Sequence, residues 1–460
     1  MGSGGATVDR RATGVRDPAR QAAFEVVAAV HRDDAYGNLA LASVLREARL
    51  SGRDAGFATE LAYGTLRSRG TLDAIVAVAA AREVGRIDPP VRDALRLGAY
   101  QLLYTRVPAH AAVSSTVDMV RAVGGRGAAG FANAVMRRIS GQDLDAWLAA
   151  VAPPYAKDPV GHLALVHHHP QWIVRAFVDA LSGDLTETAA ALAGDNERPL
   201  VHLCARPGLV SAADLAASAD GAAGRWSPYA VVLPGGSPAD VPEMADGRAH
   251  VQDEGSQLVA LALVGAPVSG GDERWLDLCA GPGGKAGLLG ALAARRGARV
   301  TAVEVAPHRA KLVEQAVVGL PVDVVCADGR TVEGSYDRVL VDAPCTGLGS
   351  LRRRPESRWR RTPSDLPPLT SLQRELLGAA LGVVRPGGVV GYATCSPHLA
   401  ETRVSVTEAV RRSGLPVEHV DARALLPDGM PDLGDGPSVQ LWPHRHGTDA
   451  MYLSVLRRVA

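Results

Sequence analysis

Cysteine is scarce in this chain, and the spacing of the few that occur excludes two common uses. The 460 residues contain five cysteines, and no two of them form a C-x-x-C pair. A dispersed, odd-numbered set argues against a disulfide framework and against a zinc site. Cys204, Cys279 and Cys326 stand in apolar or glycine-rich surroundings and are expected to be small buried hydrophobic residues. Cys345 and Cys395 each follow a turn-forming sequence instead.

Long hydrophobic runs are also missing. No apolar stretch approaches the roughly 18 residues that a membrane-spanning helix needs, and the polar, glycine-rich N-terminus has no apolar core of the secretory kind. We therefore expect no membrane association, a cytoplasmic location and a flexible tail over residues 1–17. Hydrophobic residues make up 47% of the chain and charged residues 21%, as in soluble globular proteins. A length of 460 residues predicts two or three domains.

Net charge is absent as well, because 49 Lys and Arg balance 49 Asp and Glu. The charges are nevertheless segregated along the chain. Residues 1–140 carry 19 arginines against 13 acidic residues, whereas residues 141–250 carry 6 basic against 13 acidic residues. A third segment, 352–361, holds six arginines in ten positions. The zero total therefore does not exclude an RNA partner, since a local basic surface is enough to bind phosphates.

The first part of the chain has a helical pattern. From residue 19 to 139, apolar residues recur at three- and four-residue spacing, with Gly, Pro and Asp between the periodic segments. This predicts an all-α bundle over residues 18–145. Residues 146–250 are broken into short pieces by Pro and Gly, which predicts a small α+β linker domain. Three consecutive histidines at 167–169 invite a metal site, but adjacent side chains diverge and cannot converge on one ion, so we expect none.

From residue 251 to 460 the pattern changes to alternating strands and helices. The apolar strand WLDLC, for example, runs through a turn into the helical segment KAGLLGALAARR, and strand-like and helical segments follow in turn. Such alternation predicts an α/β domain with a mostly parallel, Rossmann-like sheet covered by helices. Ligands are expected at the carboxyl ends of its strands.

A glycine-rich turn follows the first of these strands, in DLCAGPGGKAG. Gly281, Gly283 and Gly284 remove side chains where the main chain must approach a ligand, and Pro282 stiffens the turn. The turn matches neither G-x-G-x-x-G nor G-x-x-x-x-G-K-[ST]. This disfavours a dehydrogenase or an NTPase and leaves S-adenosylmethionine among the candidate ligands.

Acidic residues stand at the ends of the following strands. Glu304 ends the second strand, where a carboxylate can accept hydrogen bonds from both ribose hydroxyls. Asp328 follows the third strand, placed for the adenine amino group, and Asp342 ends the fourth. One strand-end carboxylate is often only a helix cap. Three of them, in this order after the glycine turn, predict a nucleoside ligand and favour a methyltransferase sheet.

Two cysteines stand at the ends of predicted neighbouring strands, Cys345 in VDAPCTGLGS and Cys395 in YATCSP. Buried, inert thiols are the plain alternative. Cytosine C5 is too weak a nucleophile to attack a methylsulfonium directly, but addition of a thiolate to C6 turns the ring into a reactive enamine. The adduct must then lose the C5 proton and expel the thiolate, which requires a nearby base. Asp342 is placed to hydrogen-bond the cytosine edge and to stabilise protonation at N3.

These motifs resemble the RNA 5-methylcytosine methyltransferases of the Sun/RsmB–Nop2–NSUN family. DLCAGPGGK resembles the first cofactor motif, VDAPCTG the D-A-P-C-[ST]-G motif, and ATCS the second cysteine motif. The resemblance implies that Cys395 is the nucleophile and that Cys345 helps to release the product. With Asp342 and Lys285 this gives four catalytic candidates. It also implies S-adenosyl-L-methionine as the cofactor, contacted by Cys279, Ala280, Gly281, Pro282, Gly283, Gly284, Lys285, Glu304, Asp328 and Asp342.

The sequence departs from the family pattern at the end of the second predicted strand and after the second cysteine motif. Glu304 stands where Asp is more usual, which keeps the carboxylate and lengthens it. After Cys395 the family often has P-E-E-N, whereas this chain has LAET at 399–402. Only Glu401 matches, which puts a supporting contact beneath the nucleophile in question.

The N-terminal bundle resembles the NusB-type antitermination domain. That extension is typical of the branch that methylates a cytosine in small-subunit ribosomal RNA, so the resemblance implies 16S rRNA or its assembly particle as substrate. The arginine excess of the bundle supports contacts to phosphates. We also expect the loop RRRPESRWRR to bind RNA, because arginines beside a Trp can hold the backbone and stack a base. Its candidate RNA-binding residues are Arg352, Arg353, Arg354, Arg358 and Trp359.

Two alternatives stay open. The same chemistry could act on transfer RNA, which the NusB-like bundle disfavours. The chain could instead be a non-catalytic RNA-binding scaffold in ribosome assembly or antitermination. No apolar segment is left without an intramolecular use, so we expect a monomer.

Overall fold

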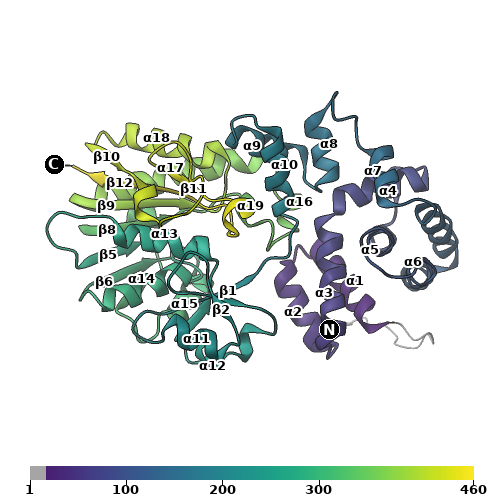
Figure 1. Cartoon of the computed structure of the whole chain (residues 1–460), viewed down its shortest axis with the longest axis horizontal. Coiled ribbons are helices and arrows are strands. Elements are labelled where there is room, and N and C mark those ends of the chain that lie inside the picture. Colours follow the sequence, from purple (N-terminus) through teal and green to yellow (C-terminus); the bar gives the residue numbers. More distant parts are fainter. Residues whose placement is uncertain (1–16, 460) are drawn as a thin grey trace, which may run out of the picture. The chain divides into compact units, whose positions relative to one another are not determined.

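The structure is a computed structural model, and it describes residues 17–459 (Figure 1). The described part of the chain forms two compact units, which divide between residues 169 and 170. The expected flexible tail at 1–17 lies outside the described residues except for its last position. The domain boundaries expected at residues 145 and 250 stay predictions. Within residues 17–459, no helix is both long enough and apolar enough to cross a membrane.

The first unit is helical. Its elements are α1 (Pro18–Arg32), α2 (Gly37–Glu47), α3 (Gly52–Arg67), α4 (Arg69–Ala80), η1 (Val84–Arg86), α5 (Pro89–Tyr104), α6 (Ala109–Ile139), α7 (Leu144–Val151) and α8 (Pro159–Val166). α1 starts at Pro18 because Asp17 Oδ1 accepts hydrogen bonds from the main-chain N of Ala19 and Arg20, at 3.0 and 3.1 Å. These bonds satisfy two amides that a helix leaves unpaired at its start. Gly125, with φ of +78°, divides α6 into two helical segments.

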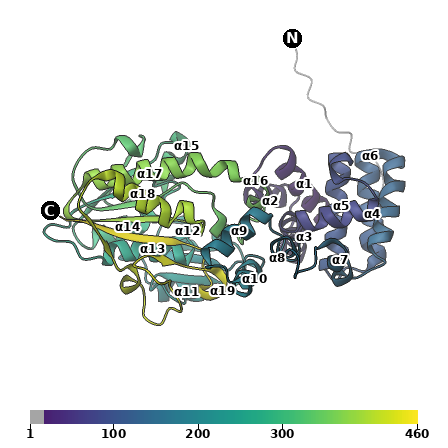
Figure 2. The same cartoon turned by 90° about the horizontal axis from the view of Figure 1, so that it is seen from above.

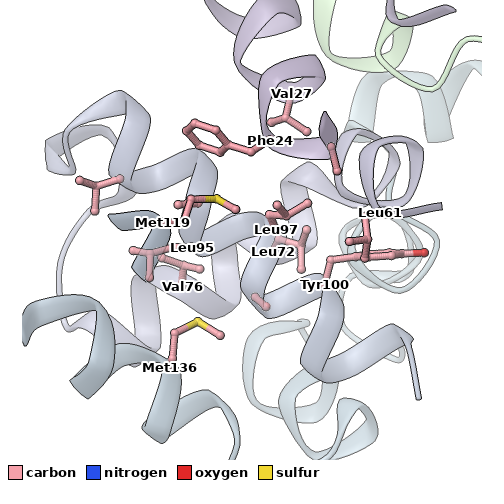
Figure 3. Close-up of a cluster of buried hydrophobic side chains, with 14 of the residues drawn as sticks. Phe24, Val27, Leu61, Leu72, Val76, Leu95, Leu97, Tyr100, Met119 and Met136 are labelled. Atoms are coloured by element: carbon pink, nitrogen blue, oxygen red, sulfur yellow. The ribbon is translucent and has the colours of Figure 1, made fainter. Parts of the chain in front are cut away.

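One apolar cluster holds this unit together. Figure 2 shows α4, α5 and α6 side by side, and Figure 3 shows the buried side chains between the helices. Gly64 of α3 makes room for the ring of Tyr100 of α5, since a Cβ atom at Gly64 would collide with it. The labelled members of the cluster are Phe24, Val27, Leu61, Leu72, Val76, Leu95, Leu97, Tyr100, Met119 and Met136.

The three consecutive histidines lie just after α8. His168 Nδ1 is 2.7 Å from the hydroxyl of Thr71, and His169 Nδ1 is 2.6 Å from the carbonyl oxygen of His167. Two of the rings therefore have protein partners. Among residues 17–459, no three His, Cys, Asp or Glu side chains lie together in a way that could hold a metal ion.

The second unit begins with helices and a small antiparallel sheet. Its first elements are α9 (Gln171–Ala180), α10 (Leu185–Gly194), β1 (Val201–Ala205), α11 (Ala212–Ser218), β2 (Ala222–Ala223), β3 (Ala230–Leu233), η2 (Pro238–Asp240), α12 (Pro242–Ala245) and β4 (Ala249–Val251). The strand order is β2-β3-β1-β4. Leu203 and Val231 point into a small apolar cluster with Leu215 of α11, so α11 covers one face of this sheet.

The large sheet follows from residue 254 onward. Its elements are α13 (Glu254–Gly265), β5 (Arg274–Asp277), α14 (Gly284–Ala294), β6 (Arg299–Val303), α15 (Pro307–Ala316), β7 (Val322–Val325), η3 (Gly329–Thr331), β8 (Tyr336–Asp342), η4 (Leu348–Ser350), α16 (Ser357–Arg360), η5 (Pro363–Asp365), α17 (Leu366–Val383), β9 (Val384–Thr394), η6 (Leu399–Glu401), α18 (Arg403–Ser413), β10 (Val417–Val420), η7 (Ala422–Leu425), β11 (Val439–Gln440), α19 (Pro443–His446) and β12 (Tyr452–Arg458). The strand order is β10-β12-β9-β8-β5-β6-β7, and β11 also pairs with β12.

The pairing confirms the predicted fold class. β7, β6, β5, β8 and β9 run parallel, while β12 is antiparallel to its neighbours β9, β10 and β11. Helices cover both faces, as neighbouring residues of β8 show, because successive strand residues point to opposite faces. Leu340 packs with Leu258 of α13 and Leu288 of α14, whereas Val339 packs with Leu377 of α17. The carboxyl ends of β5, β6, β7, β8 and β9 therefore meet at one edge of the sheet.

The three cysteines expected to be buried differ in exposure. Cys204 is buried, Cys279 is half-buried and Cys326 is exposed. The expectation was wrong for Cys326, because it directly follows β7, which is the edge strand of the sheet. An edge position leaves one side of the strand without a covering neighbour.

Candidate active site

The turn after β5 brings main chain to the ligand edge of the sheet. Gly283 has φ of +111°, in the left-handed region that residues with a Cβ atom rarely adopt. At Gly281, a Cβ atom would collide with the carboxylate of Glu304. α14 begins at Gly284, so main-chain amides at its first turn, which have no helical partners, lie at this edge. The turn and the start of α14 contain the predicted residues Cys279, Ala280, Gly281, Pro282, Gly283, Gly284 and Lys285.

Glu304 is bound to the glycine turn. It follows β6 and is only 4% exposed. Its Oε2 accepts a hydrogen bond from the main-chain N of Gly281 at 3.1 Å, and its Oε1 accepts one from the main-chain N of Ala306 at 3.0 Å. The longer Glu side chain therefore reaches across from one strand end to the neighbouring turn, which fixes both.

Asp277 lies at this edge of the sheet and is a candidate that the sequence analysis missed. It is the last residue of β5 and is fully buried. Its Oδ1 accepts a hydrogen bond from the main-chain N of Cys279 at 3.4 Å, while Oδ2 is buried without a hydrogen-bond partner among residues 17–459. Burial, together with the charge of Asp342, raises the pKa of Asp277 to about 7. Its place at the end of WLD, one strand before Glu304, was the signal that could have identified it.

Asp328 already has a strong partner in this structure. It precedes η3, and the guanidinium of Arg330 donates to both of its carboxylate oxygens, with Nε 3.0 Å from Oδ1 and Nη2 2.6 Å from Oδ2. The hydrogen bonds from Arg330 lower the pKa of Asp328. Any ligand contact by Asp328 has to share this carboxylate with Arg330.

Lys285 and Asp342 form an ion pair between α14 and the end of β8. Lys285 Nζ donates to Asp342 Oδ2 at 2.8 Å, and 10% and 29% of the two side chains are exposed. Burial is the largest influence on the pKa of Lys285 and lowers it, but the charge and hydrogen bond of Asp342, together with the charges of Cys395 and Asp277, outweigh burial in sum, so the pKa is raised. The charges of Lys285 and Asp342 both act on Cys395, so the pair lies close to that cysteine.

The two predicted cysteines are in direct contact. Cys345 Sγ lies 3.4 Å from Cys395 Sγ, although 50 residues separate them in the sequence. Cys345 follows β8 and Cys395 follows β9, and these strands are parallel neighbours. The hydrogen bond from Cys345 lowers the pKa of Cys395 against the opposing effect of burial. The same hydrogen bond, with burial, raises the pKa of Cys345, so Cys395 is the thiol that ionises first.

This difference gives a pH-dependent prediction. A thiolate, not a thiol, reacts with iodoacetamide, so alkylation of Cys395 should rise with pH through a pKa below the ordinary thiol range. In a Cys345→Ala variant the hydrogen bond is lost and the pKa should rise. Near pH 7.5, the thiolate fraction of Cys395 falls by up to roughly tenfold for each unit by which its pKa rises. Alkylation of Cys395 in the variant should therefore be severalfold slower than in the wild-type protein. Mass spectrometry of the Cys395 peptide across pH measures this, and identical profiles in both proteins would refute the assignment.

Glu401 connects the loop that follows Cys345 with the segment that follows Cys395. It is fully buried, and its carboxylate accepts hydrogen bonds from the main-chain N of Thr346 at 2.8 Å and from Gln373 Nε2 at 3.1 Å. The hydroxyl of Thr346 also donates to it. Glu401 therefore joins the loop after Cys345 to α17 and to the segment after Cys395, and supplies the contact that the LAET sequence had put in question.

We expect Glu401→Ala to destabilise this region strongly. Removing the carboxylate leaves the buried main-chain N–H of Thr346 and one N–H of Gln373 Nε2 without an acceptor, since the other Nε2 hydrogen bond goes to the carbonyl oxygen of Pro344 at 2.9 Å. We expect this to cost about 2–4 kcal/mol in the free energy of unfolding. Chemical denaturation of the full chain measures it. Glu408→Ala is the matched control, because Glu408 meets Arg411 and Arg412 in ion pairs on the surface of α18 and should leave stability unchanged. Equal stability of the two variants would show that Glu401 is not a brace.

The arginine loop is not uniformly available for RNA. Arg358 is fully buried and donates to Asn196 Oδ1 at 2.7 Å and to the carbonyl oxygen of Asp195 at 2.9 Å. Arg352 is 4% exposed and donates to the carbonyl oxygen of Gly447 at 2.7 Å. Arg354 is exposed, whereas Arg353 and Trp359 are half-buried. Burial thus argues against direct RNA contact by Arg352 and Arg358, which hold the loop in place by binding neighbouring carbonyl groups.

The fold and this edge of the sheet define the class of the protein. A seven-strand path with the order β10-β12-β9-β8-β5-β6-β7, a glycine turn after β5 and a carboxylate at the next strand end belong to a Rossmann-like methyltransferase. Residues 246–457 match the family described as 16S rRNA methyltransferase RsmB/F, and residues 17–141 match the NusB family. The chain belongs to the RsmB/F family of RNA methyltransferases and carries a NusB domain, which confirms the resemblance read from its motifs.

Individual proteins are similar over nearly the whole chain. The Mycobacterium tuberculosis protein Rv1407, named as a methyltransferase, is 57% identical over 96% of this chain and 97% of its own length. The ribosomal RNA small subunit methyltransferase B of Pseudomonas syringae pv. tomato is 32% identical over 96% of this chain and 97% of its own. The crystal structure of PH0851 has a TM-score of 0.79 at 20% identity, covering 97% of this chain and all of that one, so it shares the fold.

Proposed function

We propose that this RNA methyltransferase transfers a methyl group from S-adenosyl-L-methionine to C5 of a cytosine in small-subunit ribosomal RNA. The observation that carries the proposal is the contact between Cys345 and Cys395, 3.4 Å apart, beside the Lys285–Asp342 ion pair. A single thiol suffices to activate cytosine at C6. A second thiol in contact with the first becomes useful when the bond between the first sulfur and C6 must be broken to release the product.

The residues after β5 and β6 fit this cofactor. A buried Asp277 Oδ2 oxygen without a partner suits a ligand donor such as an ammonium group, and Glu304 is a candidate for the ribose hydroxyls. Gly283, with φ of +111°, makes the left-handed turn after which α14 begins, and this places main-chain amides of the first turn of α14 at the same edge, where a ligand can accept hydrogen bonds from them. When bound, S-adenosyl-L-methionine supplies an electrophilic methyl group on a sulfonium.

The proposed reaction forms and breaks one bond to the enzyme. The Cys395 thiolate adds to C6 of the cytosine while N3 takes up a proton, and the electron pair released to C5 then forms the C5–methyl bond as the bond between the methyl group and the sulfonium sulfur breaks, leaving a neutral thioether. Asp342 hydrogen-bonds the N3 edge of the ring and stabilises its protonated form. A base removes the C5 proton, the double bond reforms and the bond between Sγ and C6 breaks. Cys345 hydrogen-bonds the departing sulfur and so stabilises it as a thiolate.

Ribosomal RNA as the substrate rests on two supports. The matching family and the Pseudomonas relative are named for small-subunit ribosomal RNA, and the NusB domain over residues 17–141 carries an arginine excess suited to phosphates. Bisulfite sequencing of total RNA from the source organism, with and without the gene, tests both the base and the RNA. We expect one cytosine of small-subunit rRNA to lose its protection when the gene is deleted. Loss at a tRNA cytosine instead would contradict the rRNA assignment, and loss nowhere would contradict the cytosine chemistry.

A further inference from the structure

Arg353 is held through one edge of its guanidinium by Asp449. Its Nε lies 3.0 and 3.1 Å from Asp449 Oδ1 and Oδ2, and its Nη2 donates to Oδ2 as well. The structure shows no partner for Nη1 within residues 17–459. The side chain is 38% exposed, so one edge of the guanidinium is bound to protein while the other remains available to a ligand.

Asp449 is rigid enough to orient that guanidinium. Its side chain is 2% exposed, and its main-chain N donates to Asp253 Oδ1 at 3.1 Å. Burial, together with the charge of Asp449, raises the pKa of Asp253 to about 7, as expected for two carboxylates held close together. The raised pKa favours the neutral form of Asp253, and Asp449 is the carboxylate that meets the guanidinium of Arg353 directly.

The pair lies next to the nucleophile. The main-chain N of Gly349 donates to the carbonyl oxygen of Cys395 at 2.8 Å, and the main-chain N of Ala450, the residue after Asp449, donates to the carbonyl oxygen of Gly349 at 2.8 Å. Two hydrogen bonds thus link Cys395 to the Asp449 segment. Electrostatics agree, because the charge of Asp449 acts to raise the pKa of Cys395, and Cys395 acts to raise the pKa of Arg353.

A cytidine that reaches Cys395 brings its own phosphates to this place. An arginine whose guanidinium is already oriented by a carboxylate on one edge can bind a phosphate group with its other edge. Its planar N–H donors then form charge-assisted hydrogen bonds to the phosphate without a further loss of side-chain entropy. We propose that Arg353 binds a phosphate flanking the target cytidine and that Asp449 is the positioning residue that orients it. This inference rests on the proposed function, since it requires an RNA cytidine at Cys395.

A neutral phosphate analogue tests the contact directly. The substrate is a synthetic RNA stem-loop carrying the cytosine mapped by bisulfite sequencing, with a methylphosphonate replacing the phosphate on its 5′ or its 3′ side. For the wild-type protein we expect one of the two replacements to raise KM about 10- to 100-fold, the range of a lost charge-assisted bond, with kcat within a few fold. Arg353→Met should raise KM similarly on unmodified RNA and show no further penalty with methylphosphonate. Asp449→Asn should lose most of the same sensitivity.

Controls separate this contact from folding and from the proposed function. Arg423 forms a similar fork with Asp421, at 2.9 and 2.8 Å, on the exposed turn η7, so Arg423→Met should keep the wild-type response. Arg353→Lys keeps the positive charge, so its KM should still rise in part when methylphosphonate replaces the phosphate. A variant that was only misfolded would show no such partial sensitivity to the phosphate charge. An equal penalty in wild type and Arg353→Met overturns the inference alone. If wild-type protein forms no 5-methylcytosine on the unmodified RNA, the proposed function falls and this inference with it.

Discussion

A Cys345→Ala variant should accumulate a covalent complex with RNA, whereas a Cys395→Ala variant should form none. Cys395 Sγ can still add to C6 when Cys345 is missing, and the methyl group can still be transferred. The sulfur that must leave then lacks the thiol that contacts it at 3.4 Å, so release slows and the adduct persists. Without Cys395 no sulfur reaches C6, so turnover should fall below detection.

Denaturing gel electrophoresis with radiolabelled RNA measures the adduct, and release of methylated RNA measures turnover. Both cysteine variants should lose multiple turnover, so the turnover rate does not distinguish them. They differ in the amount of covalent protein–RNA complex, which Cys345→Ala should accumulate and Cys395→Ala should not form. Cys326→Ala is the matched control, since Cys326 is the exposed cysteine beyond the edge strand β7 and should behave as wild type. If neither Cys345→Ala nor Cys395→Ala differs from wild type in its covalent complex with RNA, the two-cysteine mechanism is wrong.

The second large effect is expected at Asp342. Asp342→Asn should lower kcat by about 10²- to 10⁴-fold, the usual range for a group that assists proton chemistry. The reason is double: the amide cannot stabilise a protonated N3 as a carboxylate does, and Lys285 loses the charge that it meets at 2.8 Å. Single-turnover methylation under saturating cofactor and RNA measures the chemical step.

Asp323→Asn serves as the control for this prediction. Asp323 is an exposed carboxylate in β7 that pairs with Arg299 at 2.9 Å, so the same substitution there should leave kcat unchanged. Thermal unfolding of both variants checks that Asp342→Asn remains folded. A kcat for Asp342→Asn within threefold of wild type would remove Asp342 from the proposed chemistry.

Much of the fold was predictable because its signals are local. The helical periodicity before residue 140 and the strand–helix alternation after residue 251 each occupy short windows of sequence. The glycine turn was predictable for the same reason, since Gly283 is needed by the backbone itself, with φ of +111°, whereas Gly281 is needed by the distant side chain of Glu304. The family could be inferred because its motifs are short, contiguous and ordered along the chain.

Exposure was the weakest part of the sequence analysis. Six arginines in ten positions predicted an RNA-binding loop, yet Arg358 is fully buried, and its partners Asp195 and Asn196 lie more than 160 residues earlier. Cys326 was expected to be buried and is exposed to solvent. The sequence carries no local signal for either outcome, because burial depends on which distant segment packs on the residue.

The sequence alone determined the order of elements, the cofactor turn and the two candidate cysteines, since each depends on neighbours along the chain. Only the tertiary structure decided that the two thiols touch, that Glu401 braces both loops and that Asp449 holds Arg353. These contacts join residues 50, 55 and 96 positions apart. The parallel pairing of β8 and β9 brings the cysteine loops together at one sheet edge, and the last antiparallel strand returns the Asp449 segment to the same place.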